Sequence, residues 1–170
     1  GRCVCKRRRS GRPWHVVMGS PKPHAHDAEQ AGTYIPVNCT KCAPNPADIG
    51  VAVDLLLKAE KPLIYAGEGV IYAGASAELK EFAELVNAPV MTTLKAKGAF
   101  SEDHPLFVGV RGDQVNHYLN ECDLLFAVGS SLSPVRFSHG IPNAVNNTIV
   151  HSPIDELHVH KTYPTDQDVQ

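Results

Sequence analysis

Hydrophobic residues recur every three or four positions in three separate segments of this chain. They are Ile49, Ala52, Val53, Leu56 and Ala59 in the first segment, Leu79, Phe82, Ala83 and Val86 in the second, and Val115, Tyr118, Leu119 and Cys122 in the third. Since this spacing places them on one side of an α-helix, it predicts three amphipathic helices. Asn45-Pro46 favours the start of the first helix, and the second is predicted to start near Ser76.

Short segments that are apolar nearly throughout lie after these helices. They are residues 62–66, 89–93, 123–128 and a segment that begins at residue 148. Strands of this kind are typical of a parallel sheet that is covered by helices on both faces. The sequence therefore predicts an α/β fold, a Rossmann-like doubly wound parallel sheet. Turn signals at Gly98 and at residues 103–105 predict a long loop over residues 94–110.

A glycine turn follows the first predicted strand. Right-handed crossovers would bring residues 67–69, 93–94 and 129–131 together at the carboxyl end of the sheet. Backbone N–H groups of Gly67, Glu68, Gly69 and Val70 could then meet a phosphate, although Tyr72 stands where the dinucleotide-binding pattern has its third glycine. A tight connection from strand to helix would require the same glycines. Both interpretations remain open, and Glu68 is either a functional acid or an exposed turn residue.

The loop over residues 129–140 is the second candidate site. Its small residues would allow close approach of a ligand, and Arg136 could pair with a phosphate or a carboxylate. The alternative is a polar surface loop in which Arg136 is solvated.

The first 45 residues follow neither hydrophobic period and are interpreted as an irregular leader or linker. Residues 1–26 hold seven of the 16 Lys and Arg residues and no acid, whereas the rest holds nine basic and 18 acidic residues. An acidic body does not fit a dedicated nucleic-acid-binding protein. Residues 46–170 are predicted to form the globular domain.

Overall composition narrows the class of protein. Hydrophobic residues make up 43% of the chain and charged residues 20%, as in globular domains. The sequence has no apolar run near the ~20 residues that span a bilayer, so no membrane segment is expected. Five cysteines are too few for a secreted disulfide scaffold, and we predict a cytoplasmic protein.

Metal-binding patterns are weak. Cys3, Cys5, Cys39 and Cys42 could hold a zinc ion, but only the last two have a recognised spacing. His158 and His160 alternate like neighbours on a strand, with His151 upstream, and surface histidines are the favoured interpretation. No metal site is predicted.

Four segments in order resemble the central domain of thiamine-diphosphate-dependent enzymes of the acetolactate synthase, pyruvate oxidase and 2-oxo-acid decarboxylase type. They are residues 62–70, 88–94, 97–105 and 123–129, and the resemblance extends over about residues 46–166. It implies that residues 46–170 are such a domain, with its last strand cut off after Gln170. Residues 11–17 resemble the end of the preceding, pyrimidine-binding domain of this family.

The resemblance implies a component of an enzyme rather than a whole one. The parent would use thiamine diphosphate and Mg²⁺ to cleave or join carbon–carbon bonds beside a 2-oxo group. In the family these cofactors are held mainly by the pyrimidine- and diphosphate-binding domains, and the parent is a homodimer or homotetramer. This chain lacks the Gly-Asp-Gly motif of the diphosphate-binding domain, so we expect no catalytic residue in it.

The resemblance also implies a possible nucleotide, because some relatives hold FAD or ADP in this domain. The candidate cofactor-binding residues are Gly67, Glu68, Gly69, Val70, Thr93, Leu94, Gly129, Ser130, Ser131 and Arg136. FAD-binding synthases resemble Gly-Ala-Arg-Phe-Asp-Asp-Arg after the third strand, and this chain departs from that pattern at residues 129–135. Pro153 also stands where an acidic residue is expected. We therefore expect no FAD, whereas an ADP-like ligand and a stand-alone ADP- or FAD-type nucleotide-binding module remain alternatives.

Overall fold

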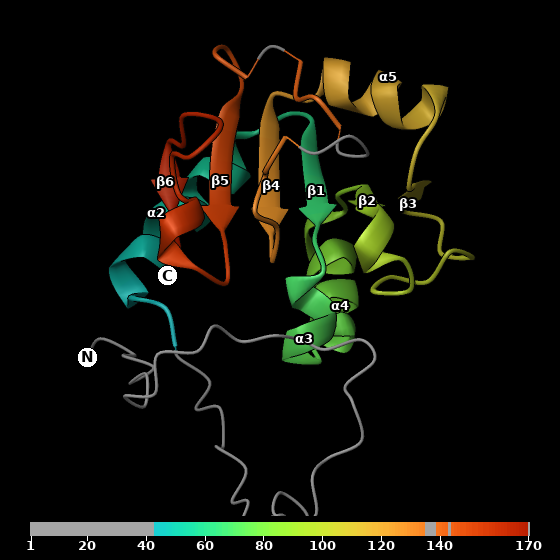
Figure 1. Ribbon diagram of the computed structural model, residues 1–170, viewed down its shortest axis with the longest axis horizontal. Helices are drawn as coiled ribbons and strands as arrows, with labels where there is room; N and C mark the ends of the chain where they lie inside the picture. Colours follow the sequence, from blue (N-terminus) through green and yellow to red (C-terminus); the bar gives the residue numbers. More distant parts are fainter. Residues whose placement is uncertain (1–42, 135–138, 143, 170) are drawn as a thin grey trace, which may run out of the picture. The chain divides into compact units, whose positions relative to one another are not determined.

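The chain divides into two units, residues 1–42 and 43–170. The computed structural model describes residues 43–134, 139–142 and 144–169 of the second unit (Figure 1). Residues 1–42 of the predicted leader therefore lie outside the described residues. They include the four cysteines of the zinc hypothesis and residues 11–17, and Arg136 also lies outside the described residues. The elements in chain order are α2 (Pro46–Lys58), β1 (Pro62–Ala66), α3 (Gly69–Ala73), α4 (Ser76–Val86), β2 (Val90–Thr92), η2 (Leu94–Ala96), β3 (Phe107–Gly109), α5 (Asp113–Glu121), β4 (Leu124–Val128), β5 (Thr148–Ser152), η3 (Glu156–His158) and β6 (Gln167–Asp168).

The strands form one six-stranded sheet in the order β3-β2-β1-β4-β5-β6. Every neighbouring pair is parallel, with Ala66 opposite Thr92 on one side of β1 and opposite Val128 on the other. This arrangement confirms the predicted doubly wound α/β fold. The strand order reverses between β1 and β4, and in open α/β sheets the crevice beyond the carboxyl ends at such a point is the usual place for a ligand.

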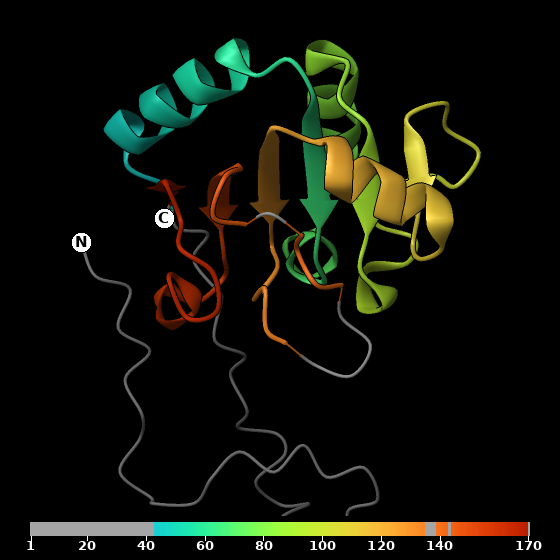
Figure 2. The ribbon, with the colours of Figure 1, turned by 90° about the horizontal axis from the view of Figure 1, so that it is seen from above.

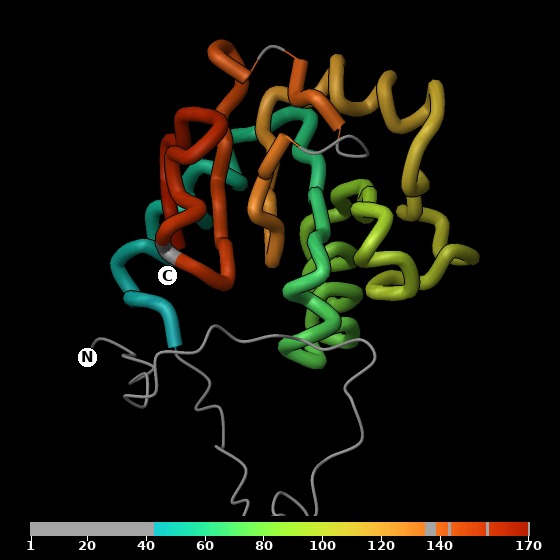
Figure 3. Tube along the Cα trace, in the orientation of Figure 1, coloured from blue at the N-terminus to red at the C-terminus, as the bar shows by residue number. Residues whose placement is uncertain are grey.

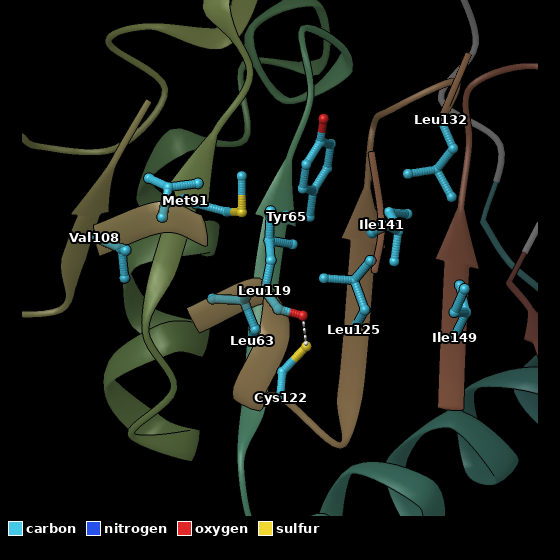
Figure 4. Close-up of a cluster of buried hydrophobic side chains, with 12 residues drawn as sticks. Leu63, Tyr65, Met91, Val108, Leu119, Cys122, Leu125, Leu132, Ile141 and Ile149 are labelled. Atoms are coloured by element: carbon cyan, nitrogen blue, oxygen red, sulfur yellow. Dashed lines mark hydrogen bonds between the residues drawn. The ribbon is translucent and has the colours of Figure 1, made fainter. Parts of the chain in front are cut away.

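Alternate residues of β1 enter two hydrophobic clusters on opposite faces of the sheet, which explains why the strand is apolar throughout. Leu63 and Tyr65 belong to the cluster that α5 covers (Figure 4). Ile64 and Ala66 belong to the cluster that α4 covers. Seen from above, α2 and α4 lie on one side of the sheet and α5 on the other (Figure 2).

Helix α2 begins as the sequence predicts, because the side chain of Asn45 accepts a hydrogen bond from the amide of Ala47 at 3.1 Å. None of its residues is buried, however, and Leu57 is 76% exposed. The trace in Figure 3 shows α2 beside β5 and β6. The apolar side of α2 is therefore not part of either of the two buried clusters.

Four short elements, η2, β3, α3 and β6, were not predicted from the sequence. The segment expected to be a long loop contains η2 and β3, and a five-residue helix, α3, precedes α4. A sixth strand, β6, follows β5 in the chain and pairs with it at Val150 and His151. Elements of two to five residues are too short to display a hydrophobic period, and β6 is defined only by its backbone pairing.

In the part of the chain that the structure describes, no helix has the length and hydrophobicity needed to cross a bilayer.

Candidate functional site

The predicted meeting of three turns is confirmed at the carboxyl end of the sheet. The amide of Gly67 donates to the carbonyl oxygen of Val128 at 2.8 Å, and the amide of Gly69 donates to that of Gly129 at 2.9 Å. On the other side of β1, the amide of Thr93 donates to the carbonyl oxygen of Ala66 at 2.9 Å. The turns after β1, β2 and β4 are therefore neighbours, and α3 leads away from this edge (Figure 1).

Residues 67–70 and residues 128–129 are joined so closely that we call them the turn clasp. A Cβ atom at Gly67 would lie 2.3 Å from the carbonyl oxygen of Gly129, a distance that atoms not bonded to each other do not reach. A Cβ atom at Gly129 would lie 2.7 Å from the amide nitrogen of Val70, and Gly129 has a φ of 62°. Glycine is therefore required on both sides of the clasp, by close approach and, at Gly129, by backbone conformation.

The amides of the clasp already have acceptors within the chain. Besides Gly67 and Gly69, the amide of Val70 donates to the carbonyl oxygen of Gly67 at 3.1 Å, and the amide of Ile71 donates to that of Glu68 at 3.1 Å. Of the amides of residues 67–71, only that of Glu68 lacks an acceptor among the described residues.

Charged and apolar side chains surround the clasp. One carboxylate oxygen of Glu68 lies 3.3 Å from Nζ of Lys95, and the other accepts a hydrogen bond from the hydroxyl of Tyr72 at 3.3 Å. Lys95 is therefore balanced by an acid at the same edge. Ile154 covers Gly69, since a Cβ atom there would lie 2.5 Å from Cδ1 of Ile154. The carboxylate of Glu68 is thus paired with Lys95 and Tyr72 rather than free in solvent.

Of the remaining candidates after β4, Ser130 forms hydrogen bonds with other described residues. Ser130 is buried, its hydroxyl accepts a hydrogen bond from the amide of Leu132 at 3.2 Å, and its carbonyl oxygen lies 2.8 Å from Nε2 of His151. Ser131 is half-buried, and Leu94 is 54% exposed at the start of η2. The amides of Gly67, Gly69 and Val70 are therefore already bonded within the protein, whereas those of Leu94, Ser130 and Ser131 have no acceptor among the described residues.

His151, which was expected on the surface, lies inside the domain, and His139 is half-buried. His151 is 1% exposed in β5, and its burial lowers its pKa. His139 is half-buried with its ring edge-on to Tyr65, at 6.1 Å between centroids, and burial lowers its pKa too. Burial raises the pKa of Tyr65 to about 12. The position of His151 inside an apolar strand was the one signal that could have predicted its burial.

The alternation of His158 and His160 does not reflect a strand. His158 ends η3 and His160 has a φ of 54°, so they are not neighbours on a strand. Across the described ranges, no three His, Cys, Asp or Glu side chains lie close enough together to hold a metal ion. Cys122 is a free, buried thiol, as its place on the apolar side of the third predicted helix indicated.

Comparison with known proteins identifies the family to which the chain belongs. The family model for the central domain of thiamine pyrophosphate enzymes matches residues 49–170. The chain is 36% identical to the probable acetolactate synthase large subunit of Methanocaldococcus jannaschii, over 92% of this chain and 28% of that protein. It is 33% identical to the acetolactate synthase isozyme 3 large subunit of Escherichia coli, over 92% of this chain and 29% of that protein.

A solved structure shares the fold. It is a protein from Mycobacterium smegmatis provisionally assigned as a thiamin diphosphate-dependent enzyme, with a TM-score of 0.65 and 24% identity, over 80% of this chain and 27% of that one. This chain spans less than a third of the length of either acetolactate synthase. The family match and the relatives together establish that the chain belongs to the thiamine pyrophosphate enzymes, with residues 49–170 corresponding to their central domain.

Proposed function

We propose that this chain provides the central domain of a thiamine-diphosphate-dependent enzyme that joins or cleaves carbon–carbon bonds beside a 2-oxo group. The observation that carries the proposal is the family match over residues 49–170, together with relatives named as acetolactate synthase large subunits. Residues 46–170 would form this domain and residues 1–45 a leader. The cytoplasmic location stays a prediction from composition.

Within such an enzyme the domain would act as a scaffold. Thiamine diphosphate, when bound, stabilises the carbanion that forms beside the carbonyl group of a 2-oxo acid. The described residues do not fit this cofactor or its Mg²⁺, because Gly112-Asp113 lacks a following glycine and begins α5, and no cluster of metal-ligating side chains accompanies it there. We therefore assign no catalytic residue to this chain.

The partners of the domain would be the pyrimidine- and diphosphate-binding domains of the parent, which would be a homodimer or homotetramer. The length of the relatives supports further domains, since the matched stretch is 28% of the first of them. The exposed apolar residues of α2, among them Leu57, are further support, because such positions are commonly covered in larger assemblies.

A stand-alone nucleotide-binding module is not favoured. The relatives are synthases much longer than this chain, and the amides of Gly67, Gly69 and Val70 in the glycine turn are bonded within the clasp.

The proposal is tested by expressing the complete coding sequence that contains these residues and assaying it with pyruvate, Mg²⁺ and thiamine diphosphate. We expect turnover that depends on thiamine diphosphate, and none from the 170-residue chain alone. A complete product that consumes no 2-oxo acid under these conditions would contradict the proposal.

A further inference from the structure

We propose that a cavity at the amino edge of the sheet binds a small organic cation, an amine that carries an apolar or aromatic body. The cavity has a volume of about 320 Å³. Sites for small molecules typically have volumes of roughly 300–1,000 Å³. The cavity lies where β1, β2 and β4 begin, at the opposite edge of the sheet from the turn clasp. A ligand there is separate from any nucleotide at the clasp and from the chemistry of the proposed function.

Apolar side chains line much of the cavity. Leu63 and Cys122 are buried members of the hydrophobic cluster that α5 covers, and Tyr118 packs against this cluster (Figure 4). Pro62 and Pro89 add two further rings to the lining. This lining favours a hydrocarbon or aromatic body in the ligand, because removing apolar surface from water stabilises the complex. The aromatic ring of Tyr118 also attracts an organic cation.

Two helices end at this cavity. Asn87 caps the carboxyl end of α4 and Cys122 caps that of α5, and both residues line the cavity. The last carbonyl groups of a helix form the negative end of its dipole, which favours a cation beside the last turn. Neither helix has a basic residue in its own last turn to balance this charge. The backbone therefore makes the cavity more favourable for a cation than for an anion.

The charged side chains of the lining act in the same direction. They are two acids, Glu60 and Glu121, and one lysine, Lys61, so the lining carries one negative charge in excess when His117 is neutral. Nζ of Lys61 lies 3.1 Å from the carboxylate of Glu121, and this hydrogen bond lowers the pKa of Glu121. The protein thus already holds one ammonium group at this position. Glu60 has no ion pair among the described residues and is available to a second one.

The test is a titration of the isotope-labelled 170-residue chain with benzylamine, followed by NMR. Benzyl alcohol and benzoate serve as neutral and anionic counterparts of similar size. At ~10 mM benzylamine, a site with a Kd of ~1 mM is about nine-tenths occupied. We expect saturable shifts of the amide signals of residues 117–122 and their neighbours in the lining with benzylamine alone. Equal binding of benzyl alcohol, preferred binding of benzoate or no saturable shift with benzylamine would each overturn the proposal.

Three variants test the charges of the site. Lys61→Gln removes the ammonium group that competes for Glu121 and should tighten the binding of benzylamine about 2–5-fold. Glu121→Gln should weaken it by about the same factor, because it removes an acid and leaves Lys61 unpaired. Both side chains are more than half exposed, so these variants should fold. Glu81→Gln makes the same change of charge as Glu121→Gln at an exposed position of α4 outside the cavity, and should leave binding unchanged. Weaker binding by Lys61→Gln, or equal effects of Glu121→Gln and Glu81→Gln, would overturn the proposal.

Discussion

The amide of Gly69 donates a hydrogen bond of 2.9 Å to the carbonyl oxygen of Gly129, sixty residues further along the chain. This bond joins the turn after β1 to the turn after β4 at the point where the strand order reverses. Many doubly wound sheets place a ligand there. In this domain the two turns are joined there by hydrogen bonds between their own backbones.

The clasp predicts that Gly129→Ala is markedly destabilising. The left-handed backbone at Gly129 costs about 1–2 kcal/mol for alanine, and the contact of its Cβ with the amide of Val70 adds about 1–3 kcal/mol. The control is Gly74→Ala, which has a similar φ of 65° and nothing within 4 Å, so that only the backbone cost applies. Urea unfolding of both variants measures the difference, and equal losses would contradict the clasp.

Sequence patterns predicted the sheet well because β1 and β4 are apolar on both faces. They also placed residues 67–69, 93–94 and 129–131 at one edge, since parallel strands all end on the same side. Whether an amide at that edge is free depends on which carbonyl oxygen lies opposite it. That partner, Gly129 for Gly69, comes from a distant turn and follows only from the assembled structure.

Asp123 is predicted to stabilise the connection between α2 and β1. Its carboxylate accepts hydrogen bonds from the amides of Glu60 at 2.7 Å and Lys61 at 2.9 Å. Asp123→Ala should lower the free energy of unfolding by about 1–2 kcal/mol, less than two buried charged hydrogen bonds would give because the site is exposed. The measurement is urea unfolding at neutral pH.

Glu121 provides the matched control for Asp123. Its 3.1 Å ion pair with Lys61 joins two side chains that are both more than half exposed. Glu121→Ala should therefore change stability little. Equal losses for the two variants would mean that charge in this region, rather than the hydrogen bonds of Asp123, holds the connection.

The buried histidines predict a loss of stability in mild acid. The pKa of His151 is lowered in the folded state by its burial, from an ordinary value of 6.5. Below that value the unfolded chain takes up a proton that the folded chain does not, so stability falls as the pH decreases toward the folded pKa. The loss is at most about 1.4 kcal/mol per pH unit for each such histidine. Unfolding measured between pH 7 and 5 should show this slope, and His151→Gln should reduce it. Parallel curves for the two proteins would exclude His151 as its source.

Thr92 offers a stabilising substitution. Its hydroxyl is fully buried at the end of β2 and has no hydrogen-bond partner among the described residues. Thr92→Val replaces the unpaired hydroxyl with a methyl group and should raise the free energy of unfolding by about 1 kcal/mol. Thr93→Val, at the neighbouring half-buried position, is the control and should have a smaller effect. A loss of stability in Thr92→Val would mean that this hydroxyl has a partner.

The most direct measurement of the whole account is made on the purified parent enzyme, by recording its visible absorbance and its turnover of pyruvate with and without thiamine diphosphate. The account predicts turnover that requires thiamine diphosphate in a protein with no flavin absorbance. Stoichiometric bound flavin, released on unfolding this domain, would contradict the expectation that no FAD is bound. A flavin-free protein without thiamine-dependent turnover would contradict the proposed function.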